Sequence, residues 1–185
     1  MLYMDIKLKP GKRLIINNKL NFIFMQDMLV RLYDLPDHSS LIKKLNEEGI
    51  IIRRPLAAEK FIIVEWITKH FGTGWASEAE VSFSYQPIAN FIAIQNGQIL
   101  GFACYDSCYR NFFGPTGVEE NQRGRGIGKA LLMECLYSMK SQGYAYAIIG
   151  GVGPAEYYAK AVKAELIEGS NPGIYNGIMS EVPVD

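Results

Sequence analysis

The sequence predicts an α/β protein with a mixed sheet flanked by helices. Three features support this class: a hairpin signal at Asn96-Gly97, an apolar strand that runs through a glycine-rich loop into a helix at residues 112–142, and a further strand and helix at residues 145–163. Strands that alternate with helices are typical of such folds. With 185 residues, 49% of them hydrophobic, the chain is long enough to fill one core.

The composition argues against several classes of function. Lys+Arg and Asp+Glu both number 19, so bulk charge indicates neither a nucleic-acid nor a membrane partner. The cysteines Cys104, Cys108 and Cys135 lack C-x-x-C spacing, which predicts reduced thiols and no metal site. No apolar run approaches the ~20 residues of a membrane span, and the first residues do not read as a signal peptide. We therefore expect a cytoplasmic protein.

The N-terminal part of the chain differs from the rest. Residues 1–27 are basic, and Asn17-Asn18 between two apolar runs suggests a small hairpin. We expect these residues to be an extension, followed by one domain at residues 28–185. That domain begins with a strand at residues 29–35. Its first helix has helical spacing of Leu41, Ile42 and Leu45 before Gly49.

The next elements are a strand and a helix. Residues 50–54 are rich in β-branched side chains and end at a proline, which predicts a strand. Residues 57–71 carry a broad apolar face at helical spacing. Gly72-Thr73-Gly74 ends that helix, and residues 75–86 fit either a short helix or a loop over a site.

The central hairpin is the clearest pattern in the chain. Residues 91–94 and 99–105 flank Asn96-Gly97, which supplies the positive φ angles of a type I′ turn. Residues 112–118 form the next strand, and Gly114, Pro115 and Gly117 within it predict a bulge or irregular pairing.

The last third of the chain continues the alternation. Residues 128–142 predict a helix closed by Gly143, residues 145–151 a buried strand, and residues 154–163 a helix opened by proline. Residues 164–182 predict two weaker strands around a glycine-rich turn.

A cradle for phosphate is predicted between the strand at 112–118 and the helix that follows it. In this loop Arg123, Gly124, Arg125, Gly126, Ile127 and Gly128 follow one another. Glycine lets the backbone curl closely round a ligand, and the N–H groups at a helix start attract negative charge. The two arginines add charges that can fork onto phosphate oxygens.

Two familiar nucleotide motifs fail on spacing. The dinucleotide fingerprint G-x-G-x-x-G would need glycine at Lys129, and the phosphate loop would need one more residue and a hydroxyl at Ala130. What remains is R-x-x-G-x-G, filled by Arg123, Gly126 and Gly128. A tight strand-to-helix turn without a ligand is the structural alternative.

The R-x-x-G-x-G pattern resembles the acetyl-coenzyme-A loop of the GNAT family, the Gcn5-related N-acetyltransferases. The predicted order of elements over about residues 50–182 also resembles that fold, with residues 29–49 as an extra strand and helix. The resemblance implies a central, mostly antiparallel, splayed sheet and acetyl-CoA or CoA as the cofactor. Residues 123–129 would then bind its diphosphate, with Lys129 beside the glycines.

The same resemblance implies where the pantetheine chain lies. It would fill the gap between the strands at 112–118 and 145–151, against the backbone at Gly117 and Val118. Gly151 stands where many relatives carry an asparagine that touches the cofactor. The implied reaction is direct attack of a primary amine on the acetyl group. A non-catalytic acyl-CoA binder of the same fold, or an unrelated nucleotide-binding module, is the alternative.

The resemblance also implies a proton donor. The segment at residues 151–158 is similar to the family pattern N-x-x-A-x-x-[FY]-Y, and it places Tyr158 at the donor position with Tyr157 beside it. The structural alternative is a pair of core aromatics. Lys163-Ala164-Glu165 replaces the Gly-Phe that usually follows this helix.

The general base is less well defined. The family position for a glutamate on the strand before the loop is Phe112, which cannot accept a proton. We select Asp106, and Glu78, Glu80, Glu119 or a water relay remain open.

The acceptor side should be shaped by residues 72–86, 105–111 and 169–175. Those segments are aromatic and mildly charged, which favours a small, partly apolar amine and leaves a peptide amine open. The resemblance also allows a homodimer, because GNAT proteins often dimerise. The aromatic residues considered for this side are Trp75, Phe83, Tyr85, Tyr105, Tyr109, Phe113 and Tyr175.

Overall fold

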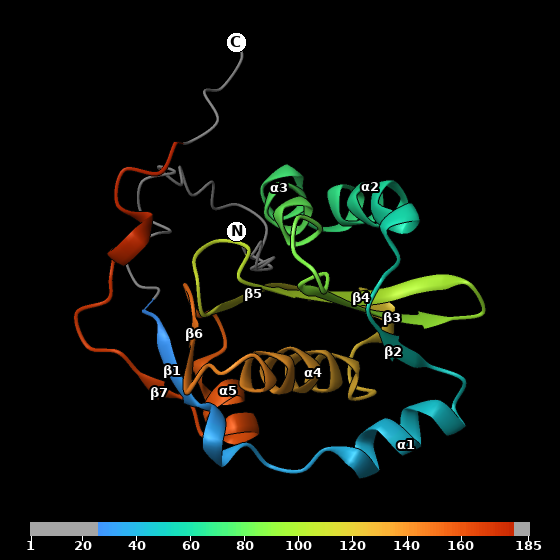
Figure 1. Ribbon diagram of the computed structural model, residues 1–185, viewed down its shortest axis with the longest axis horizontal. Coiled ribbons are helices and arrows are strands. Elements are labelled where there is room, and N and C mark those ends of the chain that lie inside the picture. Colours follow the sequence, from blue (N-terminus) through green and yellow to red (C-terminus); the bar gives the residue numbers. More distant parts are fainter. Residues whose placement is uncertain (1–25, 180–185) are drawn as a thin grey trace, which may run out of the picture.

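The structure, a computed structural model, describes residues 26–179. Its centre is a seven-stranded sheet in the order β2-β3-β4-β5-β6-β1-β7 (Figure 1). The strands are β1 Met28–Arg31, β2 Ile51–Arg53, β3 Asn90–Gln95, β4 Gln98–Tyr105, β5 Phe112–Val118, β6 Tyr146–Ile149 and β7 Glu165–Leu166. The helices are α1 Ser39–Glu47, α2 Lys60–Phe71, α3 Thr73–Ser82, α4 Ile127–Ser141 and α5 Ala155–Val162.

The sheet is mostly antiparallel. Neighbouring strands pair antiparallel everywhere except β5 and β6, which are parallel. The predicted mixed α/β class is confirmed.

The hairpin between β3 and β4 is confirmed too, because Asn96 and Gly97 have φ of 51° and 76°, both positive as a type I′ turn requires.

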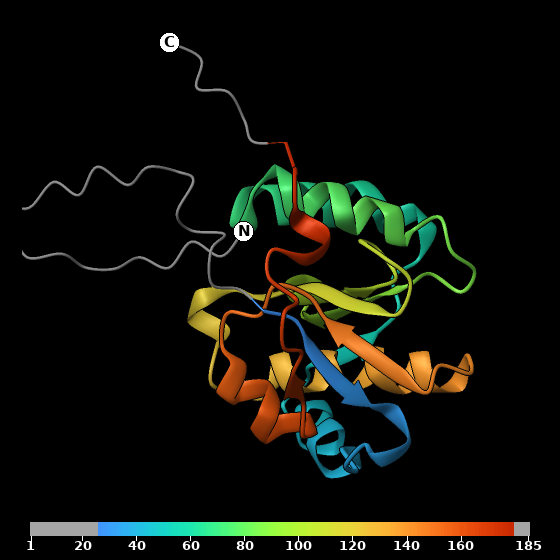
Figure 2. The same ribbon diagram turned by 90° about the vertical axis from the view of Figure 1, so that its left-hand side faces the viewer.

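Helices cover both faces of the sheet. In Figures 1 and 2, α2 and α3 lie on one face, and α1, α4 and α5 lie on the other. Leu131, Leu132 and Leu136 of α4 are fully buried against the sheet, as the apolar face of this helix predicts. The opposite core layer contains Ile63 and Ile67 of α2.

The segment after residue 72 resolves an ambiguity of the sequence. It is a helix, α3, and not a loop, and it begins directly after Gly72, whose φ is 91°. Ala76, Ala79 and Ser82 form its buried face. Because these buried residues are small, α3 lies close to the sheet. The polar residues at the edge of this face are therefore near the strands on which α3 packs.

The first and the last of the described strands pair with each other in the sheet. β1 pairs with β6 on one side and with β7 on the other. The strand predicted at residues 29–35 is therefore shorter than expected, and it turns into a 3-10 helix at Leu32–Asp34. The prediction of two strands at residues 164–182 is wrong within the described residues. Only Glu165–Leu166 pairs, because β1 already occupies the neighbouring position and glycines and proline interrupt the chain that follows.

The predicted N-terminal extension lies mostly outside the described residues, including the hairpin expected at Asn17-Asn18. Its last two residues are bonded to the domain. The Gln26 carbonyl accepts the Val152 N–H at 2.9 Å, and Asp27 Oδ1 accepts the Gly151 N–H at 2.9 Å. The domain, as far as it is described, thus begins at Gln26.

Within residues 26–179, no helix has the length and apolar character to cross a membrane. In the same part of the chain, no group of three His, Cys, Asp or Glu side chains could hold a metal ion. Cys104, Cys108 and Cys135 are free thiols.

Candidate active site

The central feature of the site is the gap that opens between β5 and β6. The two strands pair at only two positions, Phe112 with Ile148 and Phe113 with Ile149. β6 ends there, whereas β5 continues to Val118 along β4. We call the end of this pairing the splay point. Beyond it, one edge of β5 faces no other described strand.

The backbone of β5 changes course at the splay point. The register between β4 and β5 shifts between Ala103 and Tyr105, and Gly114 has a φ of 125° that other residues rarely adopt. The predicted irregularity in this strand is therefore confirmed. Its physical cause is a bulge, which bends the strand and increases its twist.

Val118 turns its backbone polar groups into the gap. The neighbouring Glu119 N–H donates to the Leu100 carbonyl of β4 at 2.9 Å. Because polar groups alternate in direction along an antiparallel strand, those of Val118 point away from β4. Arg123 Nε donates to the Val118 carbonyl at 3.2 Å, which leaves the Val118 N–H facing the gap.

Gly117 has a packing role on the α2 face. A Cβ at this position would lie 2.5 Å from the ring of Phe71, the last residue of α2. A side chain there would displace that ring, so the strand needs glycine for helix packing as well as for any ligand.

The glycine loop, residues 123–128, is shaped by two left-handed residues. Gly124 and Gly126 have φ of 81° and 93°, and Gly126 is the N-cap of α4. A Cβ at Gly126 would lie 2.8 Å from Leu41 Cδ1 of α1, whereas one at Gly124 would meet nothing within 4 Å. Gly126 therefore brings the loop against α1, and Gly124 leaves open space above it.

The start of α4 presents unpaired donors. The Ala130 N–H makes the first helical bond, to the Gly126 carbonyl at 3.0 Å. The N–H groups of Ile127, Gly128 and Lys129 precede it and have no intrahelical partner. Together with the positive end of the helix dipole, they form a site that favours an anion. Lys129 is exposed beside them.

The two arginines of the loop are placed differently. Arg125 donates to Gln122 Oε1 at 2.5 Å and to Glu48 Oε2 at 3.0 Å, so a carboxylate after α1 balances its charge. The Arg123 side chain is exposed, and among the described residues its guanidinium bonds only to the Val118 carbonyl. The positive charge available to an anion is therefore greater at Arg123 than at Arg125.

Gly151 is linked to the start of the domain. Its φ is 54°, and its N–H donates to Asp27 Oδ1. Asp27 is 6% exposed, and its own N–H donates to Ser170 Oγ at 2.8 Å. The sequence did not indicate Asp27, because a contact across so many residues leaves no local pattern.

Tyr158 lies beside the splay point. Its ring meets Phe113 edge-on at 6.4 Å between centroids, and it meets Tyr157 at 5.0 Å. The side chain is buried, and its hydroxyl forms no hydrogen bond with another described residue. Burial, with a smaller contribution from Tyr157, raises the pKa of Tyr158 above the usual tyrosine range. The group therefore keeps its proton at neutral pH, as a proton donor must.

Asp106 holds the turn between β4 and β5. Its Oδ1 accepts the Asn111 N–H at 2.6 Å, and its Oδ2 accepts the Tyr144 hydroxyl at 3.0 Å. The residue is 5% exposed and has a φ of 55°. Both carboxylate oxygens are occupied by the protein, so these contacts favour a structural role. A base at Asp106 stays a prediction that the geometry does not favour.

The three segments expected on the acceptor side do meet. Tyr175 and Cys108 lie close enough to influence each other's pKa, and the charge of Glu78 in α3 contributes to the raised pKa of both groups. A Cβ at Gly150, directly after β6, would lie 2.5 Å from the Tyr175 hydroxyl oxygen. Glu78, Cys108 and Tyr175 thus gather next to the splay point.

Two of the aromatic residues considered for that side lie elsewhere. Tyr105 is buried in the core layer of α4, where its hydroxyl contacts Ser138 Oγ at 2.9 Å and accepts from Gln142 Nε2 at 2.7 Å. Trp75 stacks on Phe71 at 5.3 Å within the α2–α3 layer. Alternation along a strand decides this, since Tyr105 points to the opposite face from Cys104.

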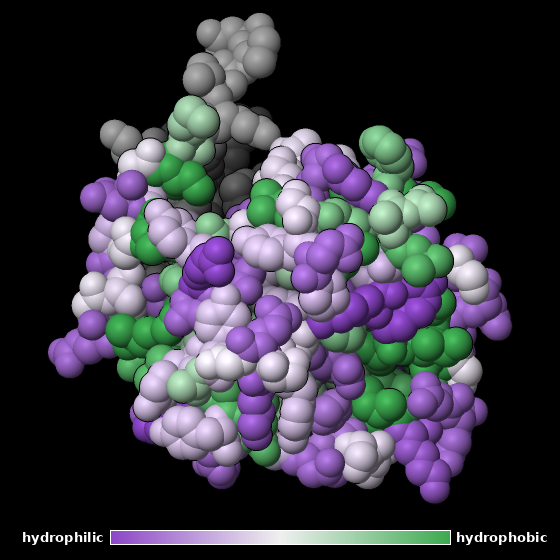
Figure 3. Space-filling model, viewed as in Figure 1, coloured by the Kyte–Doolittle hydropathy of each residue, from purple (hydrophilic) through white to green (hydrophobic). Residues whose placement is uncertain are grey.

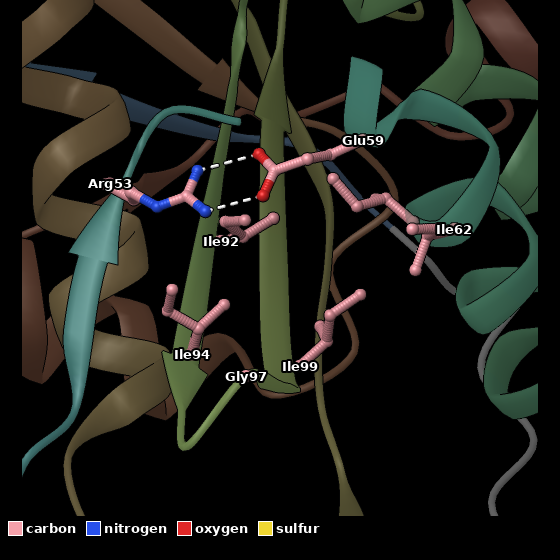
Figure 4. Close-up of a pocket in the computed structure, with 8 residues that line it drawn as sticks. Arg53, Glu59, Ile62, Ile92, Ile94, Gly97 and Ile99 are labelled. Atoms are coloured by element: carbon pink, nitrogen blue, oxygen red, sulfur yellow. Dashed lines mark hydrogen bonds and ion pairs between the residues drawn. The ribbon is translucent and has the colours of Figure 1, made fainter. Parts of the chain in front are cut away.

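A separate pocket lies under α2 (Figure 4). Isoleucines line it, and Arg53 and Glu59 close one end with two hydrogen bonds of 2.6 and 2.8 Å. The Arg53 guanidinium lowers the pKa of Glu59 to about 2. Apolar residues are also exposed on the side of α2 (Figure 3), where Phe61 is 80% and Ile62 65% exposed. None of the predicted site residues lines this pocket.

Comparisons with known proteins agree with this geometry. The sequence model described as the Acetyltransferase (GNAT) family matches residues 59–162. No curated protein matches the chain.

Solved structures share the fold at low identity. A GCN5-related glucosamine N-acetyltransferase region of a fungal multi-domain GH3 β-N-acetylglucosaminidase is 16% identical with a TM-score of 0.64, over 77% of this chain and 20% of that one. A GCN5-related N-acetyltransferase from Sphaerobacter thermophilus is 19% identical with a TM-score of 0.57, over 77% of this chain and 48% of that one. This chain therefore spans less than half of either structure's length. Because the family model covers more than half of the chain, the protein belongs to the GNAT acetyltransferase family.

Proposed function

We propose that the protein transfers an acetyl group from acetyl-CoA to a primary amine. The observation that carries this proposal is the gap between β5 and β6, which runs from the donors of the glycine loop to the splay point. An extended ligand with a diphosphate at one end and a reactive thioester at the other fits such a gap. The Val118 N–H of β5 would bond to that ligand as it would to a neighbouring strand.

The glycine loop would hold the diphosphate. Its N–H groups at Ile127, Gly128 and Lys129 point into one region, and Gly124 leaves room for close approach. Arg123 and Lys129 supply charge, and Arg125 would exchange Glu48 for a phosphate oxygen. Gly117 and Gly151 would shape the gap without bonding to the ligand. Gly117 leaves space for the Phe71 ring, and the Gly151 N–H donates to Asp27.

The reaction needs two proton transfers. An amine with a pKa near ~10.4 is almost entirely ammonium at neutral pH and must lose a proton before it attacks. As the C–N bond forms and the C–S bond breaks, the departing thiolate needs a proton. Tyr158 is the residue we assign to give it, because it is buried, protonated and next to Phe113 at the splay point.

The acceptor we propose is a small amine. The carboxylates of Glu78 and Asp27 lie near Tyr175 and favour a cationic amine, and the fungal structure of the same fold is described as a glucosamine N-acetyltransferase region. A peptide amine is the alternative within the same reaction. Three free thiols among the described residues support a reducing, cytoplasmic location.

Calorimetric titration of the full-length protein with acetyl-CoA tests the cofactor, with ATP and NAD as controls. We expect acetyl-CoA to bind and the controls not to bind. Release of free thiol in the presence of glucosamine, agmatine or 2,4-diaminobutyrate then tests the transfer. Binding without turnover of any amine would favour the non-catalytic acyl-CoA binder, and binding of a control in place of acetyl-CoA would overturn the proposal.

A further inference from the structure

Glu78 stands out among the carboxylates on the acceptor side. It lies in α3 and is half-buried, and its carboxylate has no ion-pair or hydrogen-bond partner within residues 26–179. Its neighbour Glu80, by contrast, is exposed and bonded to Lys60 Nζ at 2.7 Å. Burial of a carboxylate is costly, and titratable groups with a raised pKa are often found at functional sites.

The position of Glu78 follows from the helix. Ser82 lies one turn further along α3, on the same face, and is fully buried against Asn90 of β3. Cys104 of β4 lies opposite Asn90 in the sheet, and the Ser82 hydroxyl is close enough to influence its pKa. Glu78 therefore lies at the edge of the α3 face that packs on the sheet, and its charge acts on Cys108 in the turn after β4.

The groups around Glu78 place it at the splay point. Its charge acts on Cys104 in β4, on Cys108 in the turn after β4, and on Tyr175. The Tyr175 hydroxyl in turn lies against Gly150 at the end of β6. Glu78 thus lies near Cys108 and Tyr175, on the side of the splay point that α3 covers.

No cation among the described residues neutralises this site. Besides Glu78, the titratable groups that face it are Cys104, Cys108 and Tyr175, and Asp27 adds a second negative charge near the last two. Burial raises the pKa of Glu78, and it also raises the pKa of Cys108 to about 11. At neutral pH the thiols and the phenol are uncharged, so the site attracts a cation through its carboxylates.

We propose that Glu78 is the catalytic base that takes a proton from the acceptor ammonium. This inference rests on the proposed acetyl transfer and assigns the residue that the sequence left open. The protonated amine meets Glu78 at the splay point and gives it one proton. The free amine attacks the carbonyl carbon, and the C–N bond forms as the C–S bond breaks.

The remaining protons balance as follows. The new amide nitrogen still carries one proton too many, and the thiolate lacks one. Tyr158 gives its proton to the thiolate and regains one, through water, from the nitrogen. Glu78 releases its proton to solvent, so that one proton is produced for each amide and each thiol formed.

Substitution of Glu78 by Gln tests this assignment in the full-length protein. Glu80→Gln is the matched control, two residues away on the same helix and facing solvent. Calorimetric binding of acetyl-CoA should be unchanged in both variants, which also shows that they are folded. The rate is measured with whichever of glucosamine, agmatine or 2,4-diaminobutyrate the wild-type protein turns over.

The pH profile of kcat/KM is the decisive readout. For the wild-type protein we expect a plateau between the pKa of Glu78 and that of the amine. Without the base only the free amine reacts, so kcat/KM of Glu78→Gln should rise about tenfold per pH unit over that range. At pH 7 it should lie about 100-fold below the wild-type value. Glu78→Asp should restore part of the plateau, and Glu80→Gln should match wild type.

Three results would overturn the assignment. A Glu78→Gln profile that equals the wild-type profile would remove Glu78 from the reaction. A lower rate with the plateau retained would limit Glu78 to binding the ammonium. A wild-type protein that binds acetyl-CoA and acetylates no amine would overturn the proposed function itself, and the assignment with it.

Discussion

The two sides of the gap between β5 and β6 are built in different ways. The cofactor side consists mainly of one continuous stretch, the end of β5, the glycine loop and the first turn of α4. The acceptor side consists of Glu78, Cys108 and Tyr175, which come from α3, a turn between strands and a 3-10 helix near the C-terminus. Binding a diphosphate relies on backbone geometry that is local, whereas tuning a carboxylate requires distant segments to exclude water from it.

The difference appears in single residues. Gly126 performs its role through its own φ angle and the N–H groups that follow it. Glu78 is chemically the same as Glu80, and only its neighbours distinguish the two. Substitutions on the cofactor side should therefore act on affinity, and those on the acceptor side on rate and pH dependence.

Tyr158→Phe should have the largest effect, because Tyr158 lies at the splay point between the cofactor side and the acceptor side of the gap. Loss of the proton donor should lower kcat by about 100- to 1,000-fold while the affinity for acetyl-CoA stays nearly intact. Steady-state kinetics and calorimetry measure the two quantities. Tyr157→Phe is the control, since Tyr157 is the partly exposed neighbour. An unchanged kcat for Tyr158→Phe would assign the donor elsewhere.

Gly126→Ala should weaken acetyl-CoA binding by more than tenfold. The left-handed φ costs a residue with a Cβ about 1–2 kcal/mol, and the added methyl would also meet Leu41 at 2.8 Å, so the loop must move. Gly97→Ala carries the same kind of strain in the β3–β4 hairpin, with open space around it. The unfolding temperature should fall in both variants, whereas the calorimetric affinity for acetyl-CoA should fall only in Gly126→Ala. Equal affinities would show that the loop does not contact the ligand.

Arg125→Glu should weaken acetyl-CoA binding by about tenfold, equivalent to ~1.4 kcal/mol. The change places a negative charge beside the diphosphate and opposite Glu48. Glu48→Gln is the informative partner, because it frees Arg125 and should leave the affinity equal or higher. Calorimetry at two salt concentrations would show whether the effect is electrostatic. Unchanged affinity in Arg125→Glu would remove this arginine from the site.

Asp106→Asn should lower the free energy of unfolding by about 1 kcal/mol, since a charge-assisted bond to the Asn111 N–H is weakened. Chemical denaturation measures this loss. The pH profile of kcat/KM should keep its wild-type form. Loss of the plateau in this variant would instead identify Asp106 as the base and contradict the assignment of Glu78.

Glu59→Gln should have the smallest effect and provides a reference outside the gap. The partly buried ion pair with Arg53 is worth about 0.5–1 kcal/mol at neutral pH, after allowance for solvent screening. Because the folded pKa of about 2 lies below the usual 4.5, this stability is present above pH 4.5 and is lost as the pH falls toward 2. Unfolding measured from pH 7 to pH 2 should show the difference between variant and wild type disappear. Acetyl-CoA binding should not change.

The sequence alone determined the elements whose signals are local. Asn96-Gly97 specified its turn, the span of β5 agreed residue for residue with Phe112–Val118, and the glycine loop was placed correctly at the start of α4. Each depends on backbone angles or on hydrophobic spacing within a few residues. The same signals led to the GNAT family before any contact was known.

Only the tertiary structure decided the features that depend on distant segments. It placed β1 between β6 and β7, so that Met28–Arg31 took a position expected of the C-terminal strands. It brought Asp27 to Gly151, used both oxygens of Asp106 in a turn, and left Glu78 without a described partner near Tyr175. Strand order and desolvation are properties of the packed molecule, because they arise from contacts that no single stretch of sequence contains.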